Sequence, residues 1–283
     1  MDVKYYGGEI NGCCILNNMR VLASIILVIL TVPLLLIGIL SATARFKALD
    51  PDFWITTFEK NNVYSDITEK LKDMIVETTV KEGGSPGEIT LITDLVTPLN
   101  VKDFVDKNIK NVLNYANGKE TELFIYIPVG RAPKGFLPKE FENLPENMPA
   151  TSLFEKLNIG FTPAQIQYVS LVGRALFYLL IADLAVLFLF VLLLFVLASP
   201  GAHLISIGIA FLISGVVSLV VFFLGNRIVE QMAASSPSGP EALTLFLAAT
   251  VPPALERLLS LWLFAGLGLA VLGVLFLVLR KPR

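Results

Sequence analysis

In this sequence of 283 residues, Asp183 is the residue whose type and position most clearly suggest a chemical role, because it is a single carboxylic acid within a long apolar segment. It is the only charged residue of segment 175–198, and at a helical rise of about 1.5 Å per residue it lies ~12 Å from the start of that segment. A charged carboxylate inside a bilayer is costly unless it faces other helices, loses its charge or gains a partner. Two hypotheses remain. We favour a protonated Asp183 that hydrogen-bonds between helices or to a partner subunit, and the alternative is a proton or cation relay.

Hydroxyl groups are the hydrogen-bonding partners at hand for Asp183, since no basic residue lies at a similar depth in another apolar segment. A hydroxyl can accept from a protonated carboxyl or donate to a charged one. The first and third apolar segments hold five such residues: Ser24, Thr31, Ser206, Ser214 and Ser218. With Asp183, we take Ser214 and Ser218 as the intramembrane polar candidates.

The residue sets of familiar catalytic centres are missing from the sequence. An aspartyl intramembrane protease shares a proton between two carboxylates, and no second one lies at the depth of Asp183. His203 is the only histidine, and neither a G-x-S-x-G motif nor a Cys, Asp or Glu cluster accompanies it. The glycine-rich stretch 83–87 lacks the pattern of a phosphate-binding loop. We therefore expect a protein that is not an enzyme and binds no cofactor and no metal.

Four apolar segments are long enough to cross a membrane, which takes about 20 helical residues for ~30 Å of hydrocarbon. Hydrophobic residues make up 54% of the chain and charged residues 16%, against about 25% charged in a typical soluble domain. The first segment precedes Ala42-Thr43-Ala44, a pattern found at signal-peptidase sites, but it exceeds the usual apolar length of a signal peptide. We expect a retained signal anchor, with cleavage as the alternative. The four apolar segments are residues 21–40, 175–198, 204–225 and 258–279.

The charged residues concentrate between the first two apolar segments. Residues 45–171 hold 14 Lys/Arg and 18 Asp/Glu, of 22 and 24 in the whole chain, which is a local net charge of −4. A nucleic-acid binder needs a basic face, so this class of protein is excluded. The segment contains no cysteine and no Asn-x-Ser/Thr sequon. We therefore expect a polar domain without disulfides, in a bacterial or archaeal envelope.

The orientation follows from the positively charged residues beside the apolar segments. The two sides carry equal numbers, and the dense C-terminal cluster of Arg280, Lys281 and Arg283 favours both termini in the cytoplasm. Residues 44–171 and 226–257 then lie outside. We expect a multi-pass protein of the plasma (inner) membrane.

The polar segment begins with three predicted helices. Asp50 can cap a helix that starts at Pro51. Ser65 can cap a second helix, which ends at Gly83-Gly84, and residues 83–87 then form a linker. Apolar residues recur on one side of residues 101–116, and this periodicity predicts the strongest amphipathic helix of the chain.

The rest of the polar segment changes character after Asn117-Gly118, a pair typical of a helix C-terminus. Residues 123–129 are β-branched and aromatic, which favours a strand. Residues 131–162 carry four prolines and little periodicity, so we expect an irregular arm. Thr162-Pro163 then starts a helix that reaches Pro200 and contains the second span.

Small residues and a charged pair complete the candidate positions. Small residues spaced by four let membrane helices approach closely, and such helix-packing positions are Ala210, Ser214, Ser218, Gly266 and Ala270. Arg174 and Glu256 both lie at the outer membrane boundary, and we expect them to form an interfacial ion pair. Residues 226–257 would form an outer loop with a short interfacial helix, before a last helix that starts near Pro252-Pro253.

Two stretches resemble a family of bacterial four-span membrane proteins of the Chloroflexota type. They are residues 53–64 (FWITTFEKNNVY) and residues 112–123 (VLNYANGKETEL), within a resemblance over about residues 20–200. The resemblance implies a large extracytoplasmic domain between the first two spans. It carries no activity over, and residues 131–162 lack the Cys-Pro stretch that is common in that family.

The sequence thus predicts a membrane α-helical fold, a bundle of four transmembrane helices with a mostly α (α+β) extracytoplasmic domain inserted between the first two. The function that we expect is a scaffold, accessory subunit or sensor that presents this domain to a protein partner or to a second copy. The alternative is a small transporter or ion- or proton-conducting protein that uses Asp183. The expected segments are a cytoplasmic tail 1–20, span 21–43, outer domain 44–171, spans 172–198 and 204–225, outer loop 226–257, span 258–280 and tail 281–283.

Overall fold

The computed structural model describes residues 9–81, 83–128, 144–156, 162–197, 202–234 and 241–279, which are mostly helical. The chain divides into two compact units. The first unit comprises Met1–Ala42, Tyr178–Gly225 and Leu259–Arg283, and the second comprises Thr43–Phe177 and Asn226–Leu258. The terminal tails 1–8 and 280–283, and most of the expected arm at 129–143 and 157–161, lie outside the described residues.

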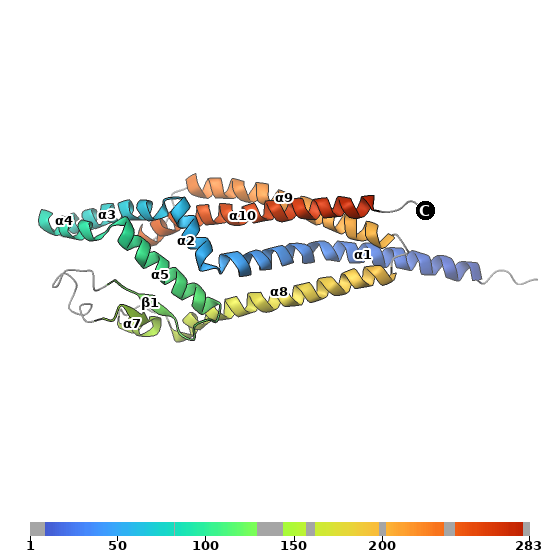
Figure 1. Ribbon diagram of the computed structural model, residues 1–283, viewed down its shortest axis with the longest axis horizontal. Helices are drawn as coiled ribbons and strands as arrows, with labels where there is room; N and C mark the ends of the chain where they lie inside the picture. Colours follow the sequence, from blue (N-terminus) through green and yellow to red (C-terminus); the bar gives the residue numbers. More distant parts are fainter. Residues whose placement is uncertain are drawn as a thin grey trace, which may run out of the picture. The chain divides into compact units, whose positions relative to one another are not determined.

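Among the described residues, four helices are long and apolar enough to cross a membrane, as predicted. They are α1 (Glu9–Thr43), α8 (Pro163–Leu197), α9 (Ala202–Ala234) and α10 (Glu241–Val278). Their apolar stretches are Met19–Ala48, Pro163–Leu197, His203–Met232 and Leu247–Val278. Within the first unit, the parts of these helices run lengthwise beside one another (Figure 1).

The first unit has a core to which all four of these helices contribute. Leu27 of α1, Leu194 of α8 and Ile207 of α9 are buried together. Phe276 of α10 packs against this cluster and against Phe211 of α9, with an edge-to-face ring contact of 5.8 Å between centroids. The predicted four-helix bundle is therefore observed within this unit.

The second unit contains shorter elements. After a π-helical turn at Ala44–Ala48, they are α2 (Pro51–Lys60), α3 (Val63–Lys81), α4 (Pro86–Leu95), α5 (Pro98–Ala116), β1 (Phe124–Tyr126), β2 (Asn147–Pro149) and α7 (Ala150–Lys156). β1 and β2 are antiparallel, with Ile125 opposite Met148. The unit is therefore α+β, with helices in the majority.

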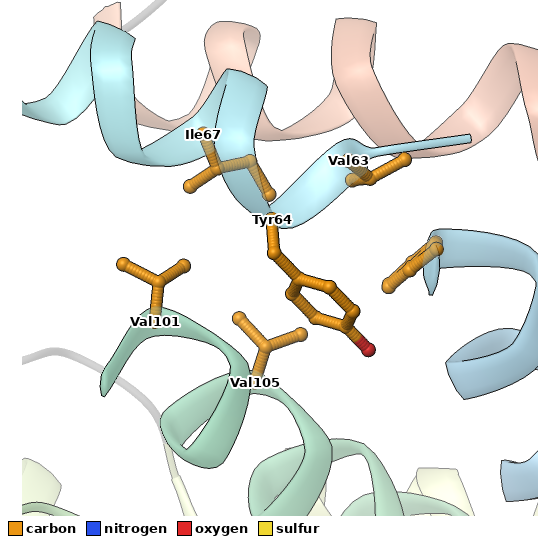
Figure 2. Packing of buried hydrophobic residues seen from close by; sticks show 6 residues of the cluster. Val63, Tyr64, Ile67, Val101 and Val105 are labelled. Carbon is orange, nitrogen blue, oxygen red and sulfur yellow. The ribbon is translucent and has the colours of Figure 1, made fainter. Parts of the chain in front are cut away.

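The main core of the second unit joins α2, α3 and α5. Its buried members are Phe58, Val63, Tyr64, Ile67, Val101 and Val105. Figure 2 shows Val63, Tyr64 and Ile67 of α3 facing Val101 and Val105 of α5. A second cluster joins Tyr115 of α5 to Leu123 just before β1, to Ala150 at the start of α7 and to Ile166 of α8.

Helix starts are partly as predicted. The Asp50 carboxylate accepts a hydrogen bond from the Asp52 N–H at 3.1 Å, so Asp50 does cap α2. Ser65 does not cap α3, which begins two residues earlier at Val63. The reason is Asn62, whose left-handed φ of 55° makes the tight turn and whose carbonyl accepts the N–H groups of Ser65 and Asp66.

Three further expectations are wrong. The linker at 83–87 already contains the start of α4, because Pro86 is well suited to the first turn of a helix. The arm expected at 131–162 contains β2 and α7, and the β1–β2 pairing supplies the order that periodicity did not indicate. In the range 226–257 expected to be an outer loop, the described residues 226–234 belong to the end of α9 and residues 241–257 to the start of α10, so these residues form no separate interfacial helix. α10 continues through Pro252 and Pro253.

Candidate functional site

Asp183 lies inside the first unit, packed against α1. Asp183 is only 5% exposed. A Cβ atom placed on Gly38 of α1 would lie 2.7 Å from Asp183 Oδ2, so the carboxyl group occupies the space that the missing side chain of Gly38 leaves and would have to shift if alanine stood there. Asp183 Oδ1 has no hydrogen-bond partner in the part of the chain that the structure describes.

The hydroxyl groups that we expected near Asp183 are bonded elsewhere. Four of the five donate to the backbone carbonyl four residues earlier in their own helix: Ser24 to Arg20, Thr31 to Leu27, Ser214 to Ala210 and Ser218 to Ser214, at 2.7 to 2.9 Å. Such bonds are the usual solution for a hydroxyl in an apolar helix. The Asp183 carboxyl therefore receives no hydrogen bond from these four hydroxyl groups. The fifth expected residue, Ser206, is half-buried.

Ser41 is the residue near this position that the sequence analysis missed. It is buried, and its hydroxyl has no partner among the described residues. Ser41 follows Gly38 by three positions, which places both on the same face of α1. The spacing Gly38-x-x-Ser41 was the available signal, because a small residue beside a hydroxyl in an apolar helix marks a close helix contact.

The small residues expected to pack lie where α9 and α10 approach each other within the first unit. Ala210, Ser214 and Ser218 are fully buried. A Cβ on Gly215 would lie 2.7 Å from both the Gly266 carbonyl oxygen and the Ala270 nitrogen, and a Cβ on Gly266 would lie 3.0 Å from Ser218 Cβ. The two backbones are therefore in direct contact here.

The expected ion pair between Arg174 and Glu256 is not formed in the described part of the chain. The Arg174 guanidinium donates instead to the carbonyl oxygen and the hydroxyl of Ser170, at 3.5 and 3.3 Å. Arg257 of α10, in contrast, makes long-range contacts. This side chain donates to Thr57 Oγ1 at 2.7 Å and to the Phe53 carbonyl at 3.2 Å, and its guanidinium lies 5.1 Å from the Phe53 ring centroid.

A polar network fixes α5 to α2 and α3. The Tyr64 hydroxyl donates to the Asp106 carboxylate. Lys102 pairs with Asp106 at 2.8 Å and with Glu59 at 2.6 Å, and its ammonium lies 5.1 Å from the Tyr64 ring centroid. Burial raises the pKa of the Tyr64 phenol, and the bond to Asp106 raises it further. Burial lowers the pKa of Lys102, but its bonds to Asp106 and Glu59 outweigh this effect, so the pKa is raised.

A similar arrangement fixes α5 to β1. The Tyr126 hydroxyl donates to Asp103 at 3.1 Å, Lys107 pairs with Asp103 at 3.2 Å, and the Lys107 ammonium lies 3.8 Å from the Tyr126 ring centroid. Asn108 adds a two-way bond, since its amide donates to the Tyr126 carbonyl and accepts the Tyr126 N–H, both at 2.9 Å. In both arrangements a tyrosine, an aspartate and a lysine satisfy one another, which indicates a structural role.

An open cavity of about 390 Å³ lies in the second unit between α2, α5 and α10. We name it the apolar groove, because the surface that lines it is apolar. It is lined by residues that include Trp54, Phe58, Phe104, Ile109, Leu247 and Val251.

Neither a metal-binding group among the described residues nor a similarity to known proteins identifies a further candidate site. The described residues contain no group of three or more His, Cys, Asp or Glu side chains placed to hold a metal ion. Comparisons with protein-family models, with curated proteins and with solved structures find no match to this chain.

Proposed function

We propose that this chain is a non-enzymatic integral membrane protein of the cell envelope. It acts as a scaffold, accessory subunit or sensor, and presents its second unit to a partner. In this proposal the protein belongs to the plasma (inner) membrane, and both termini are cytoplasmic, as the cluster of Arg280, Lys281 and Arg283 favours. The polar domain at 44–171 then lies outside, as the resemblance to the bacterial four-span family also implies.

The observation that carries the proposal is the continuity of the long helices. α8 passes from the second unit to the first between Phe177 and Tyr178, without a break in the helix. α9 and α10 likewise each run from one unit into the other. The second unit is a folded domain with a core of its own, and unbroken helices join it to the expected membrane spans. This arrangement suits the presentation of a domain to a partner better than it suits a flexibly tethered catalytic domain.

The internal use of polar groups also supports this proposal. Four charged side chains of α5 pair with residues of the same unit, namely Lys102, Asp103, Asp106 and Lys107. Catalytic groups, in contrast, are held ready for a substrate in a cleft.

The test is to purify the full-length protein from native membranes in a mild detergent and to identify what remains bound by mass spectrometry. A protein bound reproducibly in near-stoichiometric amount supports the subunit or scaffold role and identifies the partner, and a stable homo-oligomer supports assembly with a second copy. A clean monomer with no bound protein would contradict the proposal and favour the alternative below.

The alternative is transport or proton conduction through Asp183. The specific observation behind it is that the buried Asp183 Oδ1 lacks a partner among the described residues, since an unsatisfied carboxyl in an apolar bundle is a functional candidate. Asp183→Asn separates the two proposals in vesicles that contain the purified protein. Loss of a proton or cation flux at unchanged protein level would favour transport, whereas a change in thermal stability without any wild-type flux would favour the scaffold.

A further inference from the structure

The apolar groove has the size of a ligand site. Its volume of about 390 Å³ lies within the range of roughly 300–1,000 Å³ that small-molecule pockets occupy. Two aromatic residues on its walls, Trp54 and Phe58, are held by an edge-to-face contact with ring centroids 6.0 Å apart. Phe104 and Leu247 also line the groove, and each is more than two-fifths exposed.

The polar side chains along the groove are committed to the protein. The Trp54 indole N–H donates to the Ala48 carbonyl at 2.7 Å. The Asn108 amide group donates to the carbonyls of Phe104 and Tyr126, and its oxygen accepts the Tyr126 N–H. A ligand with its own donors and acceptors would lose its hydrogen bonds to water here without replacement, which is unfavourable. A hydrocarbon chain loses none and gains by the removal of its surface from water.

One of the helices that line the groove, α10, indicates where such a hydrocarbon chain would come from. Leu247, Thr250 and Val251 of α10 line the groove, and they are also the first residues of the apolar stretch Leu247–Val278 that can cross a membrane. One wall of the groove is therefore made by a helix segment whose length and composition suit the hydrocarbon region of a membrane.

From these observations we propose that the apolar groove binds the hydrocarbon chain of a membrane lipid. Such a chain covers Phe104 and Leu247 and lies against Trp54. This site goes beyond the proposed presentation role and does not depend on it.

Tryptophan fluorescence tests the proposal directly, because Trp54 lines the groove and Trp262 is the only other tryptophan. Trp262→Phe leaves Trp54 as the sole reporter in the full-length protein. This variant is reconstituted into phosphatidylcholine vesicles whose acyl chains are either brominated or unbrominated. Bromine quenches an indole that it touches, so we expect brominated chains to quench the Trp54 emission.

Two groove variants and one matched control identify the site. In the Trp262→Phe background, Leu247→Asp places a carboxylate in the groove and should abolish quenching. Leu99→Asp makes the same change on α5 at a residue that is 72% exposed and does not line the groove, so quenching should persist. If Leu247→Asp does not fold, Val251→Phe fills the groove without a charge and should reduce quenching.

Either of two results would overturn the proposal. One is the absence of quenching with Trp262→Phe alone, which would leave the groove to another occupant, such as an apolar face of a protein partner. The other is equal quenching in the groove variants and in Leu99→Asp, which would mean that Trp54 meets bulk lipid and not a chain held in the groove.

Discussion

Gly173 is the position where a single methyl group should do most damage to this fold. It lies in α8, where this helix touches the C-terminal end of α5 within the second unit. A Cβ atom on Gly173 would lie 1.8 Å from the Ala116 carbonyl oxygen and 2.7 Å from the Ala116 carbonyl carbon. Gly173 is within a regular helix, so alanine meets no conformational obstacle there. The effect of Gly173→Ala therefore comes from this contact alone.

The cost can be worked out from the distances. Real Cβ atoms essentially never approach other atoms closer than 3.0 Å, so the contact must open by about 1.2 Å from 1.8 Å. Since Ala116 O belongs to the backbone, no side-chain rotation relieves it, and α5 must move away from α8. That movement loosens the cluster in which Tyr115 of α5 packs with Ile166 of α8. Overpacking costs ~1–3 kcal/mol, and a clash with backbone belongs at the upper end, ~3 kcal/mol.

Thermal unfolding of the purified protein in detergent, followed by circular dichroism, measures this effect. For a chain of this size ~3 kcal/mol corresponds to a decrease in Tm of roughly 6 °C. Gly268→Ala is the matched control, because a Cβ on Gly268 of α10 would have no atom within 4 Å. Alanine is favoured over glycine inside a helix by about 0.5–1 kcal/mol, so the control should unfold at the same or a slightly higher temperature. A Gly173→Ala protein as stable as the wild type would refute the close approach of α5 and α8.

Two further predictions concern polar contacts of the second unit. Tyr64 has a raised pKa through burial and its bond to Asp106, so its contribution to stability is complete below the ordinary phenol pKa of about 10 and is lost as the pH rises above it. Tyr64→Phe should therefore lower the free energy of unfolding at pH ~7 by about 1.5–3 kcal/mol. It should also reduce the loss of stability at alkaline pH. If chemical denaturation gave the variant the same dependence of unfolding free energy on pH as the wild type, the prediction would be contradicted. Arg257→Ala removes two hydrogen bonds to α2 and a cation–π contact with Phe53, and should cost ~2 kcal/mol. Arg174→Ala, whose bonds stay within its own turn, should change the Tm little in the same assay.

Local chemistry made much of this fold predictable from the sequence. Spans are set by length and hydrophobicity, and four helices match the four apolar segments. Asp50 and Pro51 start α2 because a carboxylate can accept the free N–H groups of a first turn and proline has none to satisfy. Gly118, with a φ of 70°, follows α5 as predicted, since glycine adopts the left-handed conformation freely.

The expectations that failed depended on contacts between distant residues. β2 has too few residues for a periodic pattern, and its order comes from pairing with β1. α10 continues through Pro252 and Pro253, although prolines normally mark a helix boundary, because a helix in an apolar environment keeps its remaining hydrogen bonds. Arg257 rather than Arg174 reaches across the fold, and the sequence could not distinguish the two because both flank a span.

In the candidate site, too, local chemistry was predictable and contacts between distant residues were not. The sequence identified Asp183 by its charge, and the structure shows it buried as expected. It did not predict that Gly38 makes room for the carboxyl group, because that contact joins residues far apart along the chain. The expected hydroxyl partners failed for a local reason, since serine and threonine in a helix can bond to a carbonyl of their own preceding turn.

The glycines between α9 and α10 also restrict how these two helices can slide along each other. Gly208 faces Gly273, and Gly215 faces Gly266, so the pairing steps backward along one helix as it steps forward along the other. A displacement by one helical turn in one direction would bring Trp262 to the place of Gly266, where the backbone of α9 leaves no room for an indole ring. Small residues thus do more than permit a close approach: because Trp262 lies one turn from Gly266, they also disfavour this shift and help to fix the alignment of the two helices.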